Sequence, residues 1–208
     1  MFSNAKEKSR MKLLSSNNIL GLFRVAVNNV QFCFMRLTGR DVVCKGKCTS
    51  RISNEFNVSR KGHLRLGYHV GAQKGCRFLV RNQGRLEIGS NVAVNSNCIV
   101  ACHDCISIGD NCEFGPNVLI YDHDHDFRQP GGMKSRLFKT APVSVGEGTW
   151  LAANVTILRG TTIGKNCVIG AGVTLRGITV PDNTLVIADQ NLNYKEIVRV
   201  DNRADNLV

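Results

Sequence analysis

The stretch VGEGTWLAANVTILRGTTIGKNCVIGAGVTLRGITVPDNTLV, residues 145–186, repeats every six residues. It divides without a slip into seven hexads that begin at Val145, and the first position is aliphatic in six of them. An alternating strand repeats every two residues and an α-helix about every 3.6, so a sustained period of six requires short straight segments separated by regular corners. The period therefore predicts a parallel β-solenoid.

The same phase returns upstream of this stretch. IGSNVA and VNSNCI start at Ile88, and IGDNCE and FGPNVL start at Ile108, with two extra residues between the two pairs. A weaker copy surrounds Leu66. We expect the first hexad positions to point into the core, and these are Val145, Leu151, Ile157, Ile163 and Ile169.

The cysteines follow the hexads. Four of the nine occupy the fifth position, where valine stands in other hexads: Cys76, Cys98, Cys112 and Cys167. A free thiol packs as a small hydrophobic group, so these need no partner. The alternative is a metal site in CIVACHDC, with Cys98, Cys102, His103 and Cys105, but its spacing matches no familiar zinc pattern. We therefore expect no metal.

Residues 121–142 break the rhythm, within LIYDHDHDFRQPGGMKSRLFKTAPVSVG. This segment opens on alternating Asp and His and then carries Pro130 and two glycines. If its start is extended, His123 and His125 point to the same side, because side chains alternate along a strand. We interpret the segment as an excursion from the solenoid that builds a wall of the active site.

Residues 15–39, SSNNILGLFRVAVNNVQFCFMRLTG, are predicted to form a helix. Serines and asparagines stand at its start as N-caps, and Gly39 is a C-cap candidate. Helical spacing gathers one apolar face of Ile19, Leu20, Phe23, Val27, Val30, Phe34 and Leu37. We expect this face to cover the open end of the solenoid, since terminal coils need a cap. Contact with a membrane is the other interpretation of this face.

Charge is uneven along the 208 residues, whose formal net charge is +11. Between Met1 and Arg51 stand ten basic and two acidic residues, a net +8. Such a basic end suits phosphates, an anionic membrane surface or an acidic glycan. The early apolar run is interrupted by Arg24 and Asn28, so neither a secretory signal nor a membrane span is predicted. We expect a cytoplasmic protein that works at the inner face of the membrane if it contacts one.

The hexads and the excursion resemble the hexapeptide-repeat acyltransferases, which include galactoside, maltose, serine and polysaccharide O-acetyltransferases. The resemblance spans residues 64–186 and is most specific in IGDNCEFGPNVLIYDHDHDF and in the hexads from residue 143 on. It implies an all-β fold, a left-handed parallel β-helix. We therefore divide the chain into a basic helical segment at 1–51, the catalytic β-helix at 52–188 with its loop at 121–142, and a tail at 189–208.

The resemblance also implies site residues. In sugar acetyltransferases of this group, an aliphatic residue and a short polar run lead to one histidine, and here Ile120 and YDHDH place His125 there. His125 is the expected general base, with His123 as the rival. Asn95, thirty residues earlier, and His103 are expected to orient the acceptor or the histidine.

The family binds acetyl-CoA in a groove between chains of a trimer, and we expect both here. TWLAANV and VIGAGVTLRG point to Trp150, Ala153 and Ala171, whose small or flat surfaces would admit the pantetheine. The family's Thr-Lys-Asp is replaced by LRGIT, so Arg176 is expected at the nucleotide phosphate, with Lys195 as a further contact. No nucleic acid partner is expected.

These residues predict direct acetyl transfer to a sugar hydroxyl, because imidazole can deprotonate the hydroxyl and no activated nucleophile is evident. One rival is N-acetylation of an amino sugar nucleotide. The other is a trimeric metalloprotein like the γ-type carbonic anhydrases, which would need three converging histidines. A basic N-terminal helix is poorly suited to close over a small sugar, so the expected acceptor is a surface polysaccharide or its lipid-linked precursor.

Overall fold

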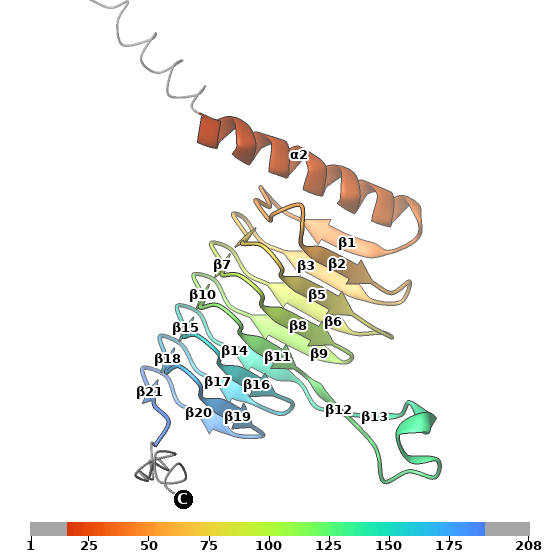
Figure 1. Ribbon diagram of the computed structural model, residues 1–208, viewed down its shortest axis with the longest axis vertical. Coiled ribbons are helices and arrows are strands. Elements are labelled where there is room, and N and C mark those ends of the chain that lie inside the picture. The colour runs from red at the N-terminus through yellow and green to blue at the C-terminus, as the bar shows by residue number, and fades with distance from the viewer. Residues whose placement is uncertain (1–15, 190–208) are drawn as a thin grey trace, which may run out of the picture.

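The computed structural model describes residues 16–189, with side chains from residue 19 on. Short parallel strands stack into three sheets, which form the three faces of a solenoid, and one helix lies across its N-terminal end (Figure 1). The first face, sheet I, contains β1 (Asp41–Cys44), β3 (His63–Leu66), β6 (Arg85–Ile88), β9 (Cys105–Ile108), β14 (Val143–Val145), β17 (Thr162–Ile163) and β20 (Thr179–Val180).

The other two faces continue each coil in chain order. Sheet II contains β4 (Gly71–Ala72), β7 (Ala93–Val94), β10 (Glu113–Phe114), β15 (Trp150–Leu151), β18 (Val168–Ile169) and β21 (Leu185–Val186). Sheet III contains β2 (Glu55–Val58), β5 (Arg77–Val80), β8 (Ile99–Cys102), β11 (Leu119–Tyr121), β16 (Thr156–Leu158) and β19 (Thr174–Arg176). The predicted parallel solenoid is therefore confirmed.

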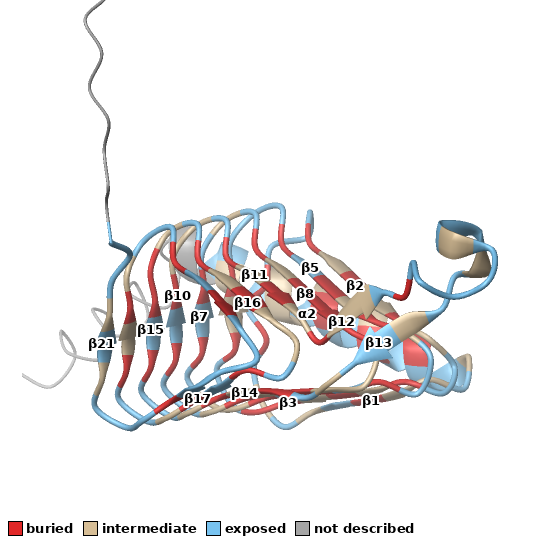
Figure 2. Cartoon of the chain, turned by 90° about the horizontal axis from the view of Figure 1, so that it is seen from below, coloured by how far each residue is buried: buried red, intermediate tan, exposed pale blue. Residues whose placement is uncertain are grey.

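Its core is built from the residues that the hexad phase selects. The five predicted inward residues from Val145 to Ile169 are all at most 2% exposed, and the four fifth-position cysteines are at most 1% exposed. Figure 2 shows these buried residues alternating with exposed ones around each coil. The cysteines are free thiols packed as small core side chains, as the sequence predicts.

Coil length falls along the stack, apart from the coil that carries the excursion, where the offset is 37 residues. Paired strands are offset by 22 residues at the N-terminal end, by 20 at Ser90 and Asp110, by 18 at Thr149 and Cys167, and by 17 at Lys165 and Asp182. The prediction that residues 145–186 divide without a slip is therefore wrong in the last coil. The corner after β19 is one residue shorter, so Val180, not Pro181, fills the core position.

The corners have their own chemistry. Within residues 16–189, ten non-glycine residues have positive φ, and eight of them are asparagines, because an asparagine tolerates the left-handed turn. At the corner after sheet I, coils approach closely: a Cβ on Gly146 would meet the backbone of Gly164 at 2.4 Å. These glycines let the coils stack at strand spacing.

Helix α2 (Ser16–Leu37) covers the end of the solenoid, but by a different face from the predicted one. Buried Asn28 donates hydrogen bonds to the carbonyls of Cys48 and Ser50, and Phe32 and Met35 pack beside it. The first coil donates its backbone N–H groups to the second coil, so its own carbonyls have no coil to pair with, and a polar side chain faces them. The predicted apolar face is mostly exposed. The C-cap prediction holds, since Gly39 has φ 78° and Arg40 N–H donates to Met35 O.

The excursion forms an antiparallel hairpin of β12 (His123–His125) and β13 (Phe138–Thr140), with a 3₁₀ turn at Gly132–Ser135 between them. It projects from the side of the solenoid, and its tip is mostly exposed (Figure 1, Figure 2). Its two ends meet, because Ala141 N–H donates to Asp122 O at 2.9 Å. Sheet I pairs directly across the gap, with Ser107 bonded to Ser144, 37 residues later.

Candidate active site

The hairpin decides where the histidines of the DHDHD run point. β12 is extended, and His125 lies opposite Phe138 on β13, their ring centroids 4.6 Å apart. His123 also contacts Phe138, at 5.4 Å, so the two histidines share one side of the strand, as predicted. Asp124 lies on the other side. His125, the expected general base, is exposed, whereas the side chain of His123 is mostly buried against the solenoid.

Asp122 anchors the base of the hairpin. Its side chain is fully buried and accepts hydrogen bonds from the backbone N–H groups of His103 (2.8 Å) and Asp104 (2.8 Å) and from Nδ1 of His123 (3.0 Å). Burial opposes the carboxylate charge, but the bonds from His123 and the two backbone groups outweigh it and hold the pKa of Asp122 below its usual range. A buried anion thus fixes the tautomer and direction of His123.

His103 comes from the preceding coil and stacks on His123, with ring centroids 3.7 Å apart and an interplanar angle of 21°. Phe138 meets the edge of the His103 ring at 4.4 Å. Burial, reinforced by the neighbouring His123, lowers the pKa of His103 to about 4. His103 is therefore neutral at physiological pH and acts as a packing surface for the hairpin.

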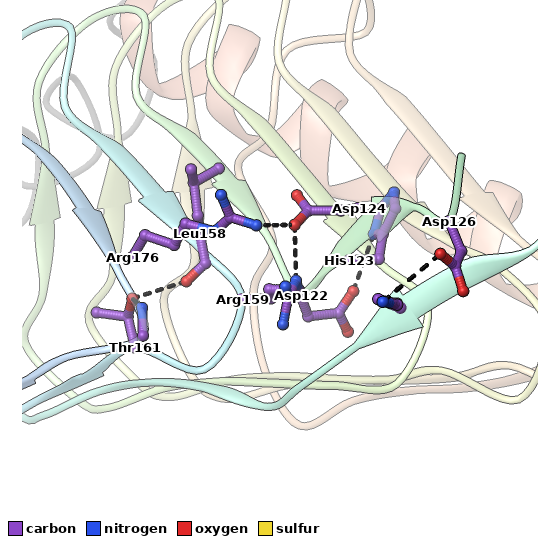
Figure 3. Close-up of polar contacts among 10 residues, drawn as sticks. Asp122, His123, Asp124, Asp126, Leu158, Arg159, Thr161 and Arg176 are labelled. Atoms are coloured by element: carbon purple, nitrogen blue, oxygen red, sulfur yellow. Dashed lines mark hydrogen bonds and ion pairs between the residues drawn. The ribbon is translucent and has the colours of Figure 1, made fainter. Parts of the chain in front are cut away.

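Asp124 ties the hairpin to the two following coils. Its Oδ2 accepts from Nε of Arg159 at 2.7 Å and from Arg176 at 2.5 Å, and Figure 3 shows the carboxylate between the two guanidinium groups. Burial works against the charge of Asp124, but the two arginines prevail and hold its pKa below the usual range. Arg176, predicted to meet the nucleotide phosphate, is thus placed beside the hairpin that carries His125.

A pocket of about 170 Å³ opens beside His125. Four basic residues and two carboxylates line it together with His125 and Phe127: Arg128, Lys139, Arg159, Arg176, Asp124 and Asp126. Lys139 lies 3.6 Å from Asp126, and Asp124 is shared by two arginines. The pocket therefore keeps a net positive charge when all six ionise.

The other predicted residues lie on a different part of the chain. Trp150 is 49% exposed on the outer surface of sheet II, and Ala153 and Ala171 stack one coil apart at the corner between sheets II and III. Asn95 is exposed at that same corner, nearer the N-terminal end, where its Oδ1 accepts from Ser96 N–H at 2.7 Å. Lys195 lies outside the described residues.

Within one chain these two groups do not meet. Asn95 lines a pocket with Arg24, Glu113 and Phe114, whereas His125 lines the pocket beside the hairpin. The corner of Ala153 and the hairpin stand at opposite ends of the strands of sheet III, a separation on the order of 15 Å for about five extended residues. The structure brings together His125, His123, His103 and Arg176, and it leaves Asn95, Trp150 and the two alanines apart from them.

Sequence reasoning missed the residues that hold the hairpin in place. Phe138 and Arg159 were not singled out, and Asp122 was taken only as part of a charged run. The sequence could have indicated Arg159, because it is a basic residue within the hexad ILRGTT. This hexad lies one coil after the strand from which the acidic excursion leaves. Within residues 16–189, no three His, Cys, Asp or Glu side chains gather to hold a metal ion.

Comparison with known proteins assigns this chain to a class. A family model described as bacterial transferase hexapeptide (six repeats) matches residues 142–177. A putative lipopolysaccharide biosynthesis O-acetyl transferase, WbbJ, from Escherichia coli K12 is 30% identical over 62% of this chain and 69% of its own length. The chain therefore belongs to the hexapeptide-repeat acyltransferases.

Solved structures agree on the architecture. A maltose O-acetyltransferase from Clostridium difficile 630 is 32% identical, with a TM-score of 0.50 over 58% of this chain and 63% of that one. AntD, an N-acyltransferase from Bacillus cereus, is 17% identical, with a TM-score of 0.58 over 73% of this chain and 80% of that one, and shows the fold alone. The predicted left-handed parallel β-helix is confirmed.

Proposed function

We propose that this chain transfers the acetyl group of acetyl-CoA to a hydroxyl of a sugar, with His125 as general base. One observation selects His125 among three neighbouring histidines: it is exposed beside the pocket, whereas His103 and His123 are stacked on each other. The Nδ1 of His123 is also occupied by Asp122. Among these three histidines, only His125 is exposed to an incoming hydroxyl.

The chemistry needs one base and no covalent enzyme intermediate. An imidazole nitrogen of His125 takes the hydroxyl proton while the oxygen attacks the thioester carbonyl. The tetrahedral intermediate collapses, the carbon–sulfur bond breaks, and the imidazolium returns the proton to the sulfur of coenzyme A. Backbone N–H groups at the solenoid corners are the proposed donors to the oxyanion.

The active site is proposed to lie between two chains of a homotrimer. The argument rests on the distance within one chain, because the expected acetyl-CoA residues stand on the order of 15 Å from the hairpin across sheet III. In a closed symmetric ring, the corner of Asn95, Ala153 and Ala171 of one copy can face the hairpin of the next. Acetyl-CoA would lie in the groove between them.

The proposed acceptor is a surface polysaccharide or its lipid-linked precursor. The net positive pocket beside His125 suits a sugar that carries a carboxylate or phosphate. The WbbJ relative is named for lipopolysaccharide biosynthesis, which fits an acceptor of this class. The basic residues before Arg10, which lie outside the described residues, are proposed to add affinity for an acidic glycan. With such an acceptor, the proposed place of acetyl transfer is the cytoplasm.

The test is the release of coenzyme A from acetyl-CoA with a panel of acceptors and the variant His125→Ala. We expect release with acidic capsular fragments, weaker at high salt, and a loss of about 10²-fold or more in turnover in the variant with acetyl-CoA binding retained. His69→Asn is the matched control and should keep wild-type turnover, since His69 is exposed at a corner away from the hairpin and has the positive φ that asparagines adopt at other corners. Turnover near that of the wild type in His125→Ala would sink the assignment of the base.

N-acetylation of an amino sugar nucleotide is the second candidate, because AntD shares the fold. The same panel separates the two, since an amine acceptor yields an amide that survives mild alkali and a hydroxyl acceptor yields an ester that does not.

A further inference from the structure

One face of α2 is apolar and has no partner among the described residues. Seven large side chains on the helix are between 49% and 80% exposed: Ile19, Leu20, Leu22, Phe23, Val30, Phe34 and Leu37. Most of them recur at spacings of three, four and seven residues, so they form one continuous stripe. Asn28, Phe32 and Met35, which contact the solenoid, lie on the opposite side of the helix.

This stripe forms the outer surface of one end of the molecule. α2 lies across the first coil, and the rest of the solenoid extends away on the other side (Figure 1). A stripe of this size, with two exposed phenylalanines, is uncommon on a surface that faces only water. It is convex, because it is the exposed side of a single helix, and a pocket of about 220 Å³ lies only at its flank, beside Phe34. A broad surface fits it better than an inserted peptide does.

Charge identifies that surface. α2 contains no acidic residue, and its two arginines lie beside the solenoid, where Arg36 Nε donates to Val42 O and Arg24 lines a pocket with Thr49. The fifteen residues before the helix carry four basic residues and one glutamate. Two copies packed helix to helix would bring these cations together. Anionic lipid headgroups would instead complement them, while the apolar stripe enters the boundary with the acyl chains.

We propose that the outer face of α2 docks this protein on an anionic lipid bilayer, lying in the plane of the surface. No helix among residues 16–189 is long and apolar enough to cross a membrane. The docking is therefore peripheral. It does not depend on the proposed acetyl transfer, because the stripe and the hairpin are separate surfaces.

Docking would also set the height of the hairpin. From β2 to β11 there are three strand spacings, which amounts to about 14 Å along the stack. The pocket beside His125 would then stand a short distance above the headgroups, with the hairpin projecting sideways. A glycan held on a lipid could reach it without leaving the bilayer.

The experiment is flotation of the full chain with vesicles of phosphatidylglycerol and phosphatidylcholine, compared with phosphatidylcholine alone. We expect the wild-type protein to float with the anionic vesicles and to remain behind with the neutral ones. The double variant Val30→Glu and Phe34→Glu should bind at least tenfold less, because it places two carboxylates in the stripe. Far-ultraviolet circular dichroism should be unchanged, since both side chains are exposed.

Ile187→Glu is the matched control, because Ile187 is 71% exposed and Val30 is 70% exposed, at opposite ends of the solenoid. It should float like the wild type. Absence of flotation by the wild type at low salt, or equal flotation of the double variant, would overturn the proposal. So would a wild-type assembly whose mass halves in the double variant and which ignores vesicles, since the stripe would then join two copies.

Discussion

At the residue scale, the buried carboxylate of Asp122 contributes more to the stability of the hairpin base than the neighbouring His123 does. Asp122 accepts two backbone N–H bonds and one imidazole bond without exposure to water. Asp122→Asn keeps the shape but turns an amide NH₂ toward groups that are themselves donors. We expect the free energy of unfolding to fall by about 2 to 3 kcal/mol, the cost of unsatisfied buried groups.

Urea unfolding followed by circular dichroism measures this loss. Asp182→Asn is the control, because Asp182 also accepts a backbone N–H, from Lys165 at 2.7 Å, but is exposed. It should change the unfolding free energy by less than about 0.5 kcal/mol. Equal effects of the two substitutions would refute the anchoring role of Asp122.

The titration of His103 predicts a pH dependence of stability. Its pKa is about 4 in the folded protein, against an ordinary value of 6.5. Between these values the unfolded chain binds a proton that the folded chain does not, so stability falls as pH drops from 6.5 toward 4. His103→Gln should flatten this part of the curve. Melting temperature measured from pH 7 to pH 4 tests it, and an unchanged slope in the variant would contradict the prediction.

At the scale of elements, Asp124 is the clamp that holds the hairpin against the next two coils. Asp124→Asn weakens both arginine contacts, so the hairpin should become less ordered while the solenoid remains. We expect turnover to fall about tenfold and the unfolding free energy to change by less than about 1 kcal/mol, since both ion pairs are partly exposed. Coenzyme A release measures the turnover, and urea unfolding measures the free energy of unfolding.

The control for this clamp is Lys165→Met, which breaks a pair with Glu147, 3.8 Å away and remote from the hairpin. It should leave turnover unchanged. A variant of Asp124 that keeps full activity would show that the hairpin needs no such tie.

The strands of the solenoid and helix α2 also show which structural features could be predicted from the sequence. The inward residues from Val145 to Ile169 were predictable because each hexad encodes its own phase. The shortened corner before Val180 was not predictable, because the hexad pattern allows either Val180 or Pro181 as the next inward position. The packing face of α2 was missed because the carbonyls of Cys48 and Ser50 that Asn28 satisfies become unpaired only in the folded coil.

At the scale of the whole molecule, a site shared between copies predicts complementation. His125→Ala and Asn95→Ala should each be inactive alone, because each removes one half of the proposed site. When they are mixed and allowed to assemble at random, about one interface in four carries an intact His125 from one chain and an intact Asn95 from its neighbour. We expect coenzyme A release to recover to about a quarter of the wild-type rate.

Light scattering of the same mixture gives the mass of the assembly, which should be that of three chains. A site confined to one chain would yield no recovery, because every chain in the mixture carries one of the two substitutions. A stable monomer would likewise remove the proposed groove.

The closed base of the hairpin has a consequence for how such enzymes diversify. Asp122 and Ala141 are bonded to each other, and the strands on either side pair across the gap as if the excursion were absent. Residues 123–140 therefore form an insertion whose two ends meet, on a scaffold whose strands pair without it. Under the proposed function, exchange of this insertion would change the acceptor range while the strands on either side keep their pairing, and a chain without it would lose the proposed base.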